Sequence, residues 1–473
     1  MTRLLLLHPS GKLLGRKDNL YTNESLVPSL GLASVAAYCR ACGIETRIYD
    51  LRLENNGIEG VFERIDDLNP ALVGITAFTT EITSAGVLAS RIKQKYPDLQ
   101  ISVGGPHGTA MPQETLLEFE AFDSVVCGEG EKTTAELVVA TQVGGCPDLS
   151  KIPGLVYRKE GKIFSNPTRE PVADLDTLPF PAWDLFELER YNGIFPLSAS
   201  RGCPYRCYFC TPNYLGKKVR VKSHQKIMEE IAWLVERFGA KRIQFTDAMM
   251  GLLKDESIQM CDELIRSGLG RKIQWDCETR ADAVSLGLFQ KMKEAGCEWV
   301  ALGVESGNER ILGEVIKKGE TKDQIRVAVQ LAKRAGLKVR TFFILGHYTE
   351  TPETIRETIR FALELNPDAI AFGLIVPNPG SEFRKIAETK GSGFRILHNR
   401  WEDYQQFNYN CLESETFSLA ELKRWQARAY FTFYAHHPIK GFFLFFAQSA
   451  YNYRLSGLLK LPLMLLRNLL GKS

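Results

Sequence analysis

The chain has 473 residues, enough for several domains with well-buried cores. Hydrophobic residues make up 44% of it and charged residues 24%, which is the composition of an ordinary globular protein. The net charge of +3 gives no reason to expect nucleic acid as a partner.

Strands and helices are predicted to alternate through residues 1–145. Helical periodicity is expected at residues 31–43 and 82–95. Short apolar runs bounded by turn residues predict strands at residues 3–9, 45–51, 72–78, 100–106 and 123–131. This alternation predicts a doubly wound α/β domain with a parallel sheet and crossover helices.

Residues 146–195 differ in character from the segments on either side. Residues 146–164 suggest a small hairpin, and DLDTLPFPAWDLF is rich in proline and aspartate. We interpret this stretch as a linker that wraps between two domains.

Alternation resumes in residues 196–394 with longer units. Strands are expected at residues 196–201, 241–247, 273–279, 299–305, 338–346 and 369–377, with amphipathic helices between them. Eight such units would close a barrel, so six predict an open, partial (βα)6 TIM barrel. Its functional groups should lie at the carboxyl ends of the strands.

The last part, residues 395–473, is predicted to form a helical extension. Its end, residues 441–472, is rich in Phe and Leu, but polar and charged residues interrupt every apolar run, so no membrane span is expected. Two interpretations stay open: a helix packed on the barrel, or an interfacial helix at a membrane surface.

Three cysteines lie within SRGCPYRCYFC, residues 200–210. The chain has eleven cysteines, and the apolar run from Leu4 to Leu7 is too short for a signal-peptide core, so we expect a reducing, cytoplasmic setting. A zinc site of this spacing needs a second pair, and the later cysteines are single. Three thiolates on one loop instead suit an iron–sulfur cluster with one iron left open.

The segment CPYRCYFC resembles the CxxxCxxC signature of radical S-adenosylmethionine (SAM) enzymes, with the aromatic Phe209 before the third cysteine. The resemblance implies that Cys203, Cys207 and Cys210 hold a [4Fe–4S] cluster whose open iron binds SAM. It also implies cleavage of SAM to a 5′-deoxyadenosyl radical, which abstracts hydrogen from unactivated carbon, and a one-electron donor such as flavodoxin or ferredoxin.

Further segments of residues 197–383 resemble the strand ends of the same barrel, in order: IQFTDAMM, WDCETRAD, ALGVESGNERIL, TFFILGHYTET and PNPGSEF. The resemblance implies contacts to SAM from Thr246, Asp247, Glu278, Arg280, Glu305 and Ser306. Taken singly, Asp247 or Glu278 could equally be a helix cap or an ion-pair partner. The fifth segment departs from many relatives, because Tyr348 and Thr349, after His347, stand where those relatives have Pro-Gly before Glu-Thr. His347 and Tyr348 either face substrate or form an ordinary loop surface.

In the N-terminal domain, glycines follow the fourth and fifth predicted strands, where a doubly wound sheet binds its ligand. The sequence lacks a GxGxxG after the first strand, so a dinucleotide fits poorly. Segments SLGLASVAAYCRACG, GITAFTT, SVGGPHGTA and VVCGEGE resemble the cobalamin-binding domain that precedes the radical barrel in one large subgroup. The resemblance implies a cobalamin site lined by Leu30, Gly31, Leu32, Thr76, Thr79, Gly104, Gly105, Pro106, His107, Gly128, Glu129, Gly130 and Glu131.

Two alternatives for this domain stay open. The DxHxxG motif of other cobalamin proteins is absent, so a histidine ligand to cobalt from that motif is not expected. His107 is the only histidine in the expected pocket, and we do not expect it to ligate cobalt. The second alternative is that the domain keeps the parallel sheet but no longer binds cobalamin. Cys39 and Cys42 form a CxxC inside a predicted helix, where helix packing is the plainer interpretation.

These resemblances predict a cobalamin-dependent radical SAM enzyme that methylates an unactivated carbon of a hydrophobic substrate, such as a lipid or a tetrapyrrole. The alternative is a radical cyclisation or rearrangement with the same cofactors, as in the anaerobic tetrapyrrole cyclase. A tRNA methylthiotransferase should carry a second cluster site, which the spacing of the other cysteines does not suggest. A cobalamin sensor would not need three thiolates at a barrel mouth.

Overall fold

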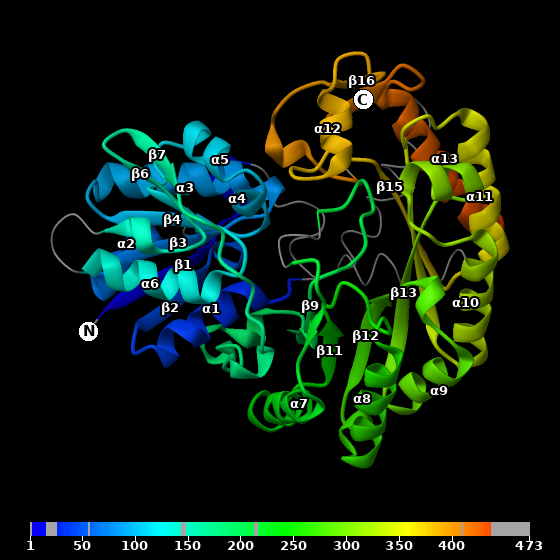
Figure 1. Cartoon of the computed structure of the whole chain (residues 1–473), viewed down its shortest axis with the longest axis horizontal. Coiled ribbons are helices and arrows are strands. Elements are labelled where there is room, and N and C mark those ends of the chain that lie inside the picture. Colours follow the sequence, from blue (N-terminus) through cyan, green and yellow to red (C-terminus); the bar gives the residue numbers. More distant parts are fainter. Residues whose placement is uncertain are drawn as a thin grey trace.

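The structure is a computed structural model and describes residues 2–15, 26–54, 57–142, 148–211, 216–407 and 410–436. An N-terminal α/β domain and a partial barrel lie side by side, and the chain passes from one to the other through an irregular connection (Figure 1).

The N-terminal sheet has the strand order β2-β1-β3-β4-β5-β6-β7. Its first five strands are parallel. They are β1 (Arg3–His8), β2 (Glu45–Asp50), β3 (Leu72–Thr76), β4 (Gln100–Gly104) and β5 (Ser124–Val126). The helices of this domain are α1 (Leu30–Ala41), α2 (Glu59–Leu68), α3 (Ile82–Lys95), α4 (Pro106–Ala110), α5 (Pro112–Glu118) and α6 (Gly130–Gln142).

Strand β1 shows why helices cover both faces of this sheet. Its side chains alternate, because successive residues of a strand point to opposite faces. Leu5 and Leu7 belong to the core cluster under α2 and α3. Leu4 and Leu6 belong to the cluster under α1 and α6. A run of four apolar residues is therefore what a doubly covered central strand requires.

The predicted hairpin forms as β6 (Leu155–Lys159) and β7 (Lys162–Ser165). It is not part of a free linker, because β6 pairs antiparallel with β5 and extends the N-terminal sheet. The sheet thus continues past residue 145, and strand pairing over such a sequence distance leaves no local signal. The domain limits themselves stay predictions.

The barrel sheet has six parallel strands in the order β15-β14-β13-β12-β11-β8, so it is open as predicted. The strands are β8 (Ile194–Leu197), β11 (Arg242–Phe245), β12 (Gln274–Thr279), β13 (Cys297–Glu305), β14 (Lys338–Leu345) and β15 (Ala369–Leu374). Helices α7 (His224–Phe238), α8 (Lys254–Arg266), α9 (Leu286–Glu294), α10 (Lys322–Arg334) and α11 (Pro352–Leu365) cover its outer face (Figure 1).

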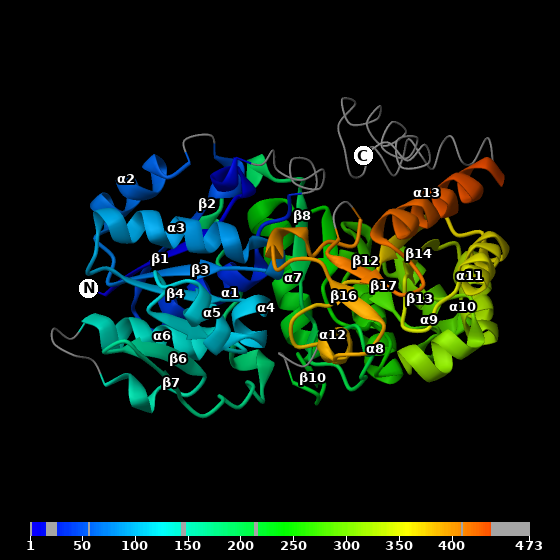
Figure 2. The same ribbon diagram turned by 90° about the horizontal axis from the view of Figure 1, so that it is seen from above.

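The extension after the barrel begins differently from the prediction of helix from residue 395. After α12 (Glu382–Glu388), an antiparallel pair forms between β16 (Phe394–Ile396) and β17 (Leu412–Ser414). Helix α13 (Leu419–His436) follows and packs against α11 and β15 (Figure 2). The Phe- and Leu-rich segment 441–472 lies outside the described residues.

Candidate active site

A cavity of about 790 Å³ lies where the carboxyl edge of the N-terminal sheet faces the mouth of the barrel. Ligand sites in proteins occupy roughly 300–1,000 Å³, so this one has room for a bulky ligand. The N-terminal wall consists of the loops after β1, β3, β4 and β5 and the start of α1. The barrel wall consists of the ends of β8 and β11 and of the cysteine loop, including Cys210.

Nearly all of the predicted cobalamin-binding residues line this cavity. They are Leu30, Gly31, Leu32, Thr76, Gly104, Gly105, Pro106, Gly128, Glu129, Gly130 and Glu131. Thr79 and His107 do not line it.

His107 is turned away from the cavity. Its Nδ1 lies 3.3 Å from the Thr79 hydroxyl, and its ring packs edge-on against Trp401, with the ring centroids 4.9 Å apart. Burial, assisted by the positive charge of Arg384, lowers the pKa of His107 to about 4. The expectation that His107 does not ligate cobalt agrees with this placement, since the imidazole joins the N-terminal domain to the extension.

Part of the N-terminal wall is backbone rather than side chain. A Cβ atom added to Gly31 would have Ser29 Oγ, 4.0 Å away, as its nearest protein neighbour, and one on Gly104 would approach nothing closer than 3.7 Å. Side chains at these positions would therefore fill the cavity. At Gly105, φ is +97° and a Cβ would lie 2.9 Å from the Ala77 carbonyl oxygen, so only glycine fits there. A cradle of this kind fits a large, rigid ligand such as cobalamin.

The cysteine loop leaves the barrel after β9 (Ser200–Arg201) and returns to it at β10 (Arg220–Val221), which pairs antiparallel with β9. Gly202 has φ of +99°, and a Cβ there would collide with the Lys218 carbonyl oxygen. Cys203 N donates to Gly216 O at 3.2 Å, and Cys210 N donates to Cys207 O at 3.0 Å. These bonds fix the course of the loop, and Cys210 lines the cavity.

Within the described residues, no three His, Cys, Asp or Glu side chains gather closely enough to hold a single metal ion. An iron–sulfur cluster does not need this, because each thiolate binds a different iron. The surrounding protein and the neighbouring Cys207 and Cys203 thiols raise the pKa of Cys210 to about 12. A metal would convert such a thiol to thiolate on binding. Three thiols on one loop, one of them opening into the cavity, fit an iron–sulfur cluster.

His347 proves to be neither a substrate-facing residue nor loop surface. It is buried after β14, and its Nδ1 lies 2.8 Å from the hydroxyl of Tyr208, which lies between two of the cysteines. Tyr348 N donates to the same hydroxyl at 3.3 Å, so the Tyr208 proton is directed to His347. Burial lowers the pKa of His347 to about 3, so the imidazole is neutral and accepts this hydrogen bond. The pair holds the cysteine loop against the barrel.

Asp247 and Thr246 shape the loop from the end of β11. Asp247 is buried, and its carboxylate accepts hydrogen bonds from Ala199 N at 3.1 Å and Ser200 Oγ at 2.5 Å, just before the cysteines. Burial raises the pKa of this carboxyl. Thr246 lines the cavity, so it is the one of the two that can face a ligand there.

A second cavity of about 260 Å³ inside the barrel shares Gln244, Thr246 and Ala248 with the first. Glu278 opens into it from β12. The pKa of Glu278 is raised, because the barrel walls limit its hydration and Glu305 carries a like charge. Among the predicted SAM-contacting residues, Thr246, Asp247 and Glu278 thus line connected space.

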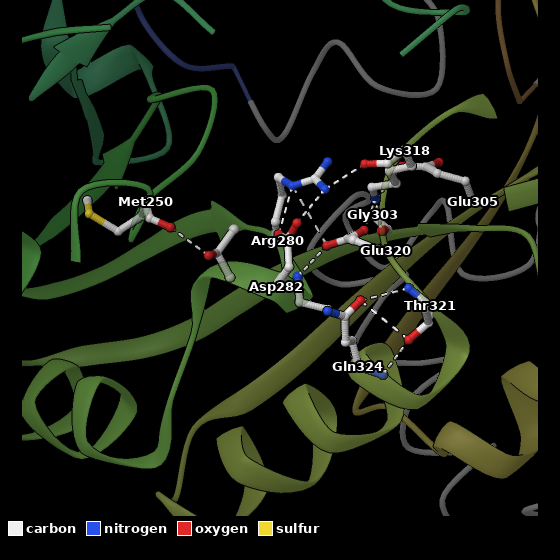
Figure 3. A network of polar contacts seen from close by, with 11 residues as sticks. Met250, Arg280, Asp282, Gly303, Glu305, Lys318, Glu320, Thr321 and Gln324 are labelled. Carbon is white, nitrogen blue, oxygen red and sulfur yellow. Dashed lines mark hydrogen bonds and ion pairs between the residues drawn. The ribbon is translucent and has the colours of Figure 1, made fainter. Parts of the chain in front are cut away.

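Arg280 and Glu305 belong to a buried charge network at the barrel mouth (Figure 3). Lys318 Nζ lies 3.4 Å from Glu305 and 3.1 Å from Glu320, and it also donates to the carbonyl of Gly303. Arg280 donates to Lys318 O at 2.6 Å. Burial alone would lower the pKa of Lys318, but Glu305 and Glu320 outweigh it and raise that pKa.

This network reaches the cysteine loop and holds a strained residue. The Arg280 guanidinium lies 3.8 Å from the centre of the Tyr205 ring. Tyr205 lies between the first two cysteines in the sequence. Glu305 has φ of +65°, a conformation that is costly for a residue other than glycine and is found mostly at functional sites. Burial raises the pKa of Glu305. The network therefore fixes charged groups beside the loop.

Two other predicted residues lie outside both cavities. Ser306 is fully buried, where its hydroxyl lies 3.3 Å from that of Thr358 and accepts from Asn308 N. Phe209 packs against the barrel core and against Tyr208. In α1, Cys39 is part of the apolar core, in agreement with helix packing, and Cys42 is exposed.

Sequence reasoning missed several residues of the site. His8, Arg52 and Phe78 line the first cavity at or just after the ends of β1, β2 and β3, so the strand-end rule that selected the glycines could have found them. Lys222 and Gln244 line its barrel side. Lys318 and Glu320 follow a helical turn rather than a strand, and no local pattern marks them.

The fold and the site define an enzyme in which a ligand-binding α/β domain and a cysteine loop on a partial barrel share one cavity. Residues 197–362 match the Radical SAM superfamily, and residues 17–138 match the B12 binding domain. The uncharacterized methyltransferase PH0819 of Pyrococcus horikoshii is 32% identical over 412 residues, 86% of this chain and 88% of that protein. This chain belongs to the cobalamin-binding radical SAM family, with a [4Fe–4S] cluster, SAM and cobalamin as its cofactors.

Two further relatives extend the comparison. The anaerobic magnesium-protoporphyrin IX monomethyl ester cyclase of Rubrivivax gelatinosus is 31% identical over 397 residues, 81% of this chain and 69% of that protein. The structure of the radical SAM methyltransferase TsrM from Kitasatospora setae matches with a TM-score of 0.69 at 20% identity, over 82% of this chain and 76% of that one. This last likeness concerns the fold alone and supports the predicted domain architecture.

Proposed function

We propose that this enzyme transfers a methyl group to an unactivated carbon of a hydrophobic small molecule. One observation carries the proposal: a single cavity runs from the glycine-lined edge of the N-terminal sheet to Cys210 at the barrel mouth. When bound, the cluster with SAM supplies a hydrogen-abstracting radical, and cobalamin supplies a methyl group. Methyl transfer to a carbon radical requires the radical source and the methyl source to reach the same substrate atom. The shared cavity has room for the substrate between them.

The chain's own residues would bind and orient the reactants. The glycine wall lets a large ring approach the sheet edge closely, and the Tyr208–His347 bond holds the cysteine loop opposite it. Apolar side chains supply much of the remaining lining, among them Leu6, Val27, Leu30, Phe78 and Leu178. Such a lining favours an apolar substrate and excludes water from the reacting carbon.

Radical cyclisation is the second candidate, because the cyclase from Rubrivivax gelatinosus is nearly as similar to this chain as PH0819 is. The product distinguishes the two reactions. Methylation adds the mass of one CH2 group to the substrate, whereas oxidative cyclisation removes hydrogen and adds no carbon.

The test uses anaerobically reconstituted full-length enzyme, a chemical reductant, methyl-labelled SAM and an organic extract of the source cells. We expect 5′-deoxyadenosine together with label in an organic-soluble product. Deoxyadenosine with a dehydrogenated product and no label would establish cyclisation and overturn methylation. Label only in water-soluble compounds would overturn the hydrophobic substrate class.

We further propose that a flavodoxin or ferredoxin delivers the electron in the cytoplasm and that the chain's end contacts a membrane surface. None of the helices in the described ranges is long and apolar enough to cross a membrane. The proposal of surface contact depends on the composition of residues 441–472. If truncation after residue 440 leaves the partition between membrane and soluble fractions unchanged, the membrane contact is refuted.

A further inference from the structure

Four charged side chains join the N-terminal domain to the two-stranded ribbon that closes the cysteine loop. Glu131 Oε1 lies 2.6 Å from Arg201, and Glu129 Oε1 lies 2.7 Å from Arg220. The other Glu129 oxygen lies 3.6 Å from Arg201 and accepts from Val172 N at 2.8 Å. Arg220 donates to Val172 O at 2.7 Å. Both carboxylates thus contact the ribbon at the edge of the cavity.

These pairs are buried, unlike most ion pairs of the protein. The Glu129, Glu131 and Arg220 side chains are 4%, 6% and 7% exposed, and that of Arg201 is 14% exposed. Removing one partner of a buried pair leaves an uncompensated charge, which costs far more than losing a surface pair. The glutamates are therefore strong constraints on the ribbon.

The ribbon formed by β9 and β10 also needs the two glutamates as countercharges. Arg201 and Arg220 lie directly opposite each other in β9 and β10, so their side chains project from the same face. Like charges directly opposite on a strand pair repel each other. Glu129 contacts both arginines and Glu131 contacts one, so the N-terminal domain supplies the countercharge that lets the ribbon close.

We propose that Glu129 and Glu131 are positioning residues for the cysteine loop and couple the order of that loop to the N-terminal domain. They act through Arg201 and Arg220, at the two ends of the segment that carries Cys203, Cys207 and Cys210. This role differs from the cofactor contact that the sequence resemblance implied. It rests on the cluster role of the cysteines and not on methyl transfer.

Hydrogen–deuterium exchange on the full-length protein without added cofactors tests this coupling, and its readout does not involve activity. We expect Glu131→Gln to speed amide exchange in residues 200–211 and 216–221 by about tenfold or more, with exchange in the N-terminal strands unchanged. The control Glu136→Gln, on the same helix α6, breaks an ion pair between Arg169 and a half-exposed carboxylate and should leave the loop unaffected.

A double variant separates coupling from general damage. Removing both partners together abolishes the uncompensated charge, so Glu131→Gln with Arg201→Gln should exchange more slowly in the loop than Glu131→Gln alone. After cluster reconstitution, Glu131→Gln should also change the electron paramagnetic resonance spectrum of the reduced cluster, although Glu131 lies in the other domain.

Loop exchange equal to wild type in Glu131→Gln, with weakened binding of added hydroxocobalamin, would overturn the proposal and leave Glu131 as a cofactor contact. If Glu131→Gln yields no folded protein, Arg201→Lys replaces it, since it keeps the charge and loses the fork geometry. Raised loop exchange in that variant supports the proposal, and unchanged exchange overturns it.

Discussion

The two walls of the cavity are built in opposite ways. The N-terminal wall is bare backbone at Gly31, Gly104 and Gly105, where added side chains would fill the space or collide. The barrel wall presents the Cys210 thiol, and buried networks around Asp247, His347 and Lys318 hold its loops. The N-terminal wall thus leaves space for a ligand, and the barrel wall supplies the reactive groups.

This difference indicates how each wall should respond to mutation. A ligand that brings its own reactive centre needs a complementary surface, so the glycine positions of the N-terminal wall should be sensitive to added volume. A cluster has to be held by residues of the protein, so the barrel wall should be sensitive to the loss of single polar atoms. The following predictions separate the two, from the largest expected effect to the smallest.

Cys207→Ser should abolish cluster assembly and lower turnover below detection while cobalamin binding stays. Each thiolate holds its own iron, and a hydroxyl does not replace it. The check is iron and sulfide content, visible absorbance and deoxyadenosine formation in anaerobic protein. Cys42→Ser is the matched control, because that thiol is exposed at the end of α1. Full turnover in Cys207→Ser would contradict the assignment.

Gly31→Leu should weaken cobalamin binding by about tenfold to a hundredfold, about 1.4–2.7 kcal/mol, and leave cluster content unchanged. The added side chain occupies the cavity, while leucine favours a helix over glycine by roughly 1 kcal/mol, so folding should not suffer. Titration with hydroxocobalamin measures the affinity.

Gly287→Leu is a close control for this variant. Gly287 is also the second residue of a helix, with a serine N-cap and open space at its Cβ, but it lies on α9 away from the cavity. Cobalamin affinity should be normal there. Equal affinities of the two variants would show that the glycine wall is not the cobalamin site.

Much of the difference between the two walls could be predicted from the sequence. The glycines and the cysteine loop stand in local motifs at strand ends, and the strand positions follow from apolar runs such as Leu4 to Leu7. The wall lining and the open barrel of six strands were therefore predictable.

The residues that hold the walls were not predictable in the same way. The bond from Tyr208 to His347 spans 139 positions, and the pair of Glu131 and Arg201 spans 70. Local patterns carry no information on such distances. For the same reason the hairpin β6–β7 was assigned to a linker, and the ion pairs of Glu129 were not foreseen.

Tyr208→Phe should lower the free energy of unfolding by about 1–3 kcal/mol and activity by about tenfold. The hydroxyl is the partner of both His347 Nδ1 and Tyr348 N, and its loss leaves the buried imidazole and the Tyr348 amide without this partner. Urea denaturation and cluster content are the measurements. Tyr430→Phe, which removes a hydroxyl bonded to Phe372 N on the far side of the barrel, should lower stability without changing the cluster. An equal loss of cluster in both variants would contradict a positioning role.

Glu350→Gln should affect activity least and reveal itself in the pH dependence of stability. Glu350 is buried, and one of its oxygens accepts from Gly346 N and His347 N, bonds that a glutamine oxygen can keep. Burial raises the pKa of Glu350 from 4.5 to about 8. Between these values the folded protein keeps a proton that the unfolded chain has lost, so stability from this group falls as pH rises and levels off above about 8.

The glutamine variant lacks this dependence. Its stability relative to wild type should therefore increase as pH rises from about 5 to about 8, by up to ~1.4 kcal/mol per pH unit, and stay constant at higher pH. His347, whose pKa of about 3 makes stability fall as pH drops below its ordinary value, is present in both proteins and cancels from the difference. Urea denaturation across this pH range gives the result. A difference independent of pH would mean that Glu350 is charged in the folded protein, and that the loop is held by an ionised carboxylate instead of a neutral one.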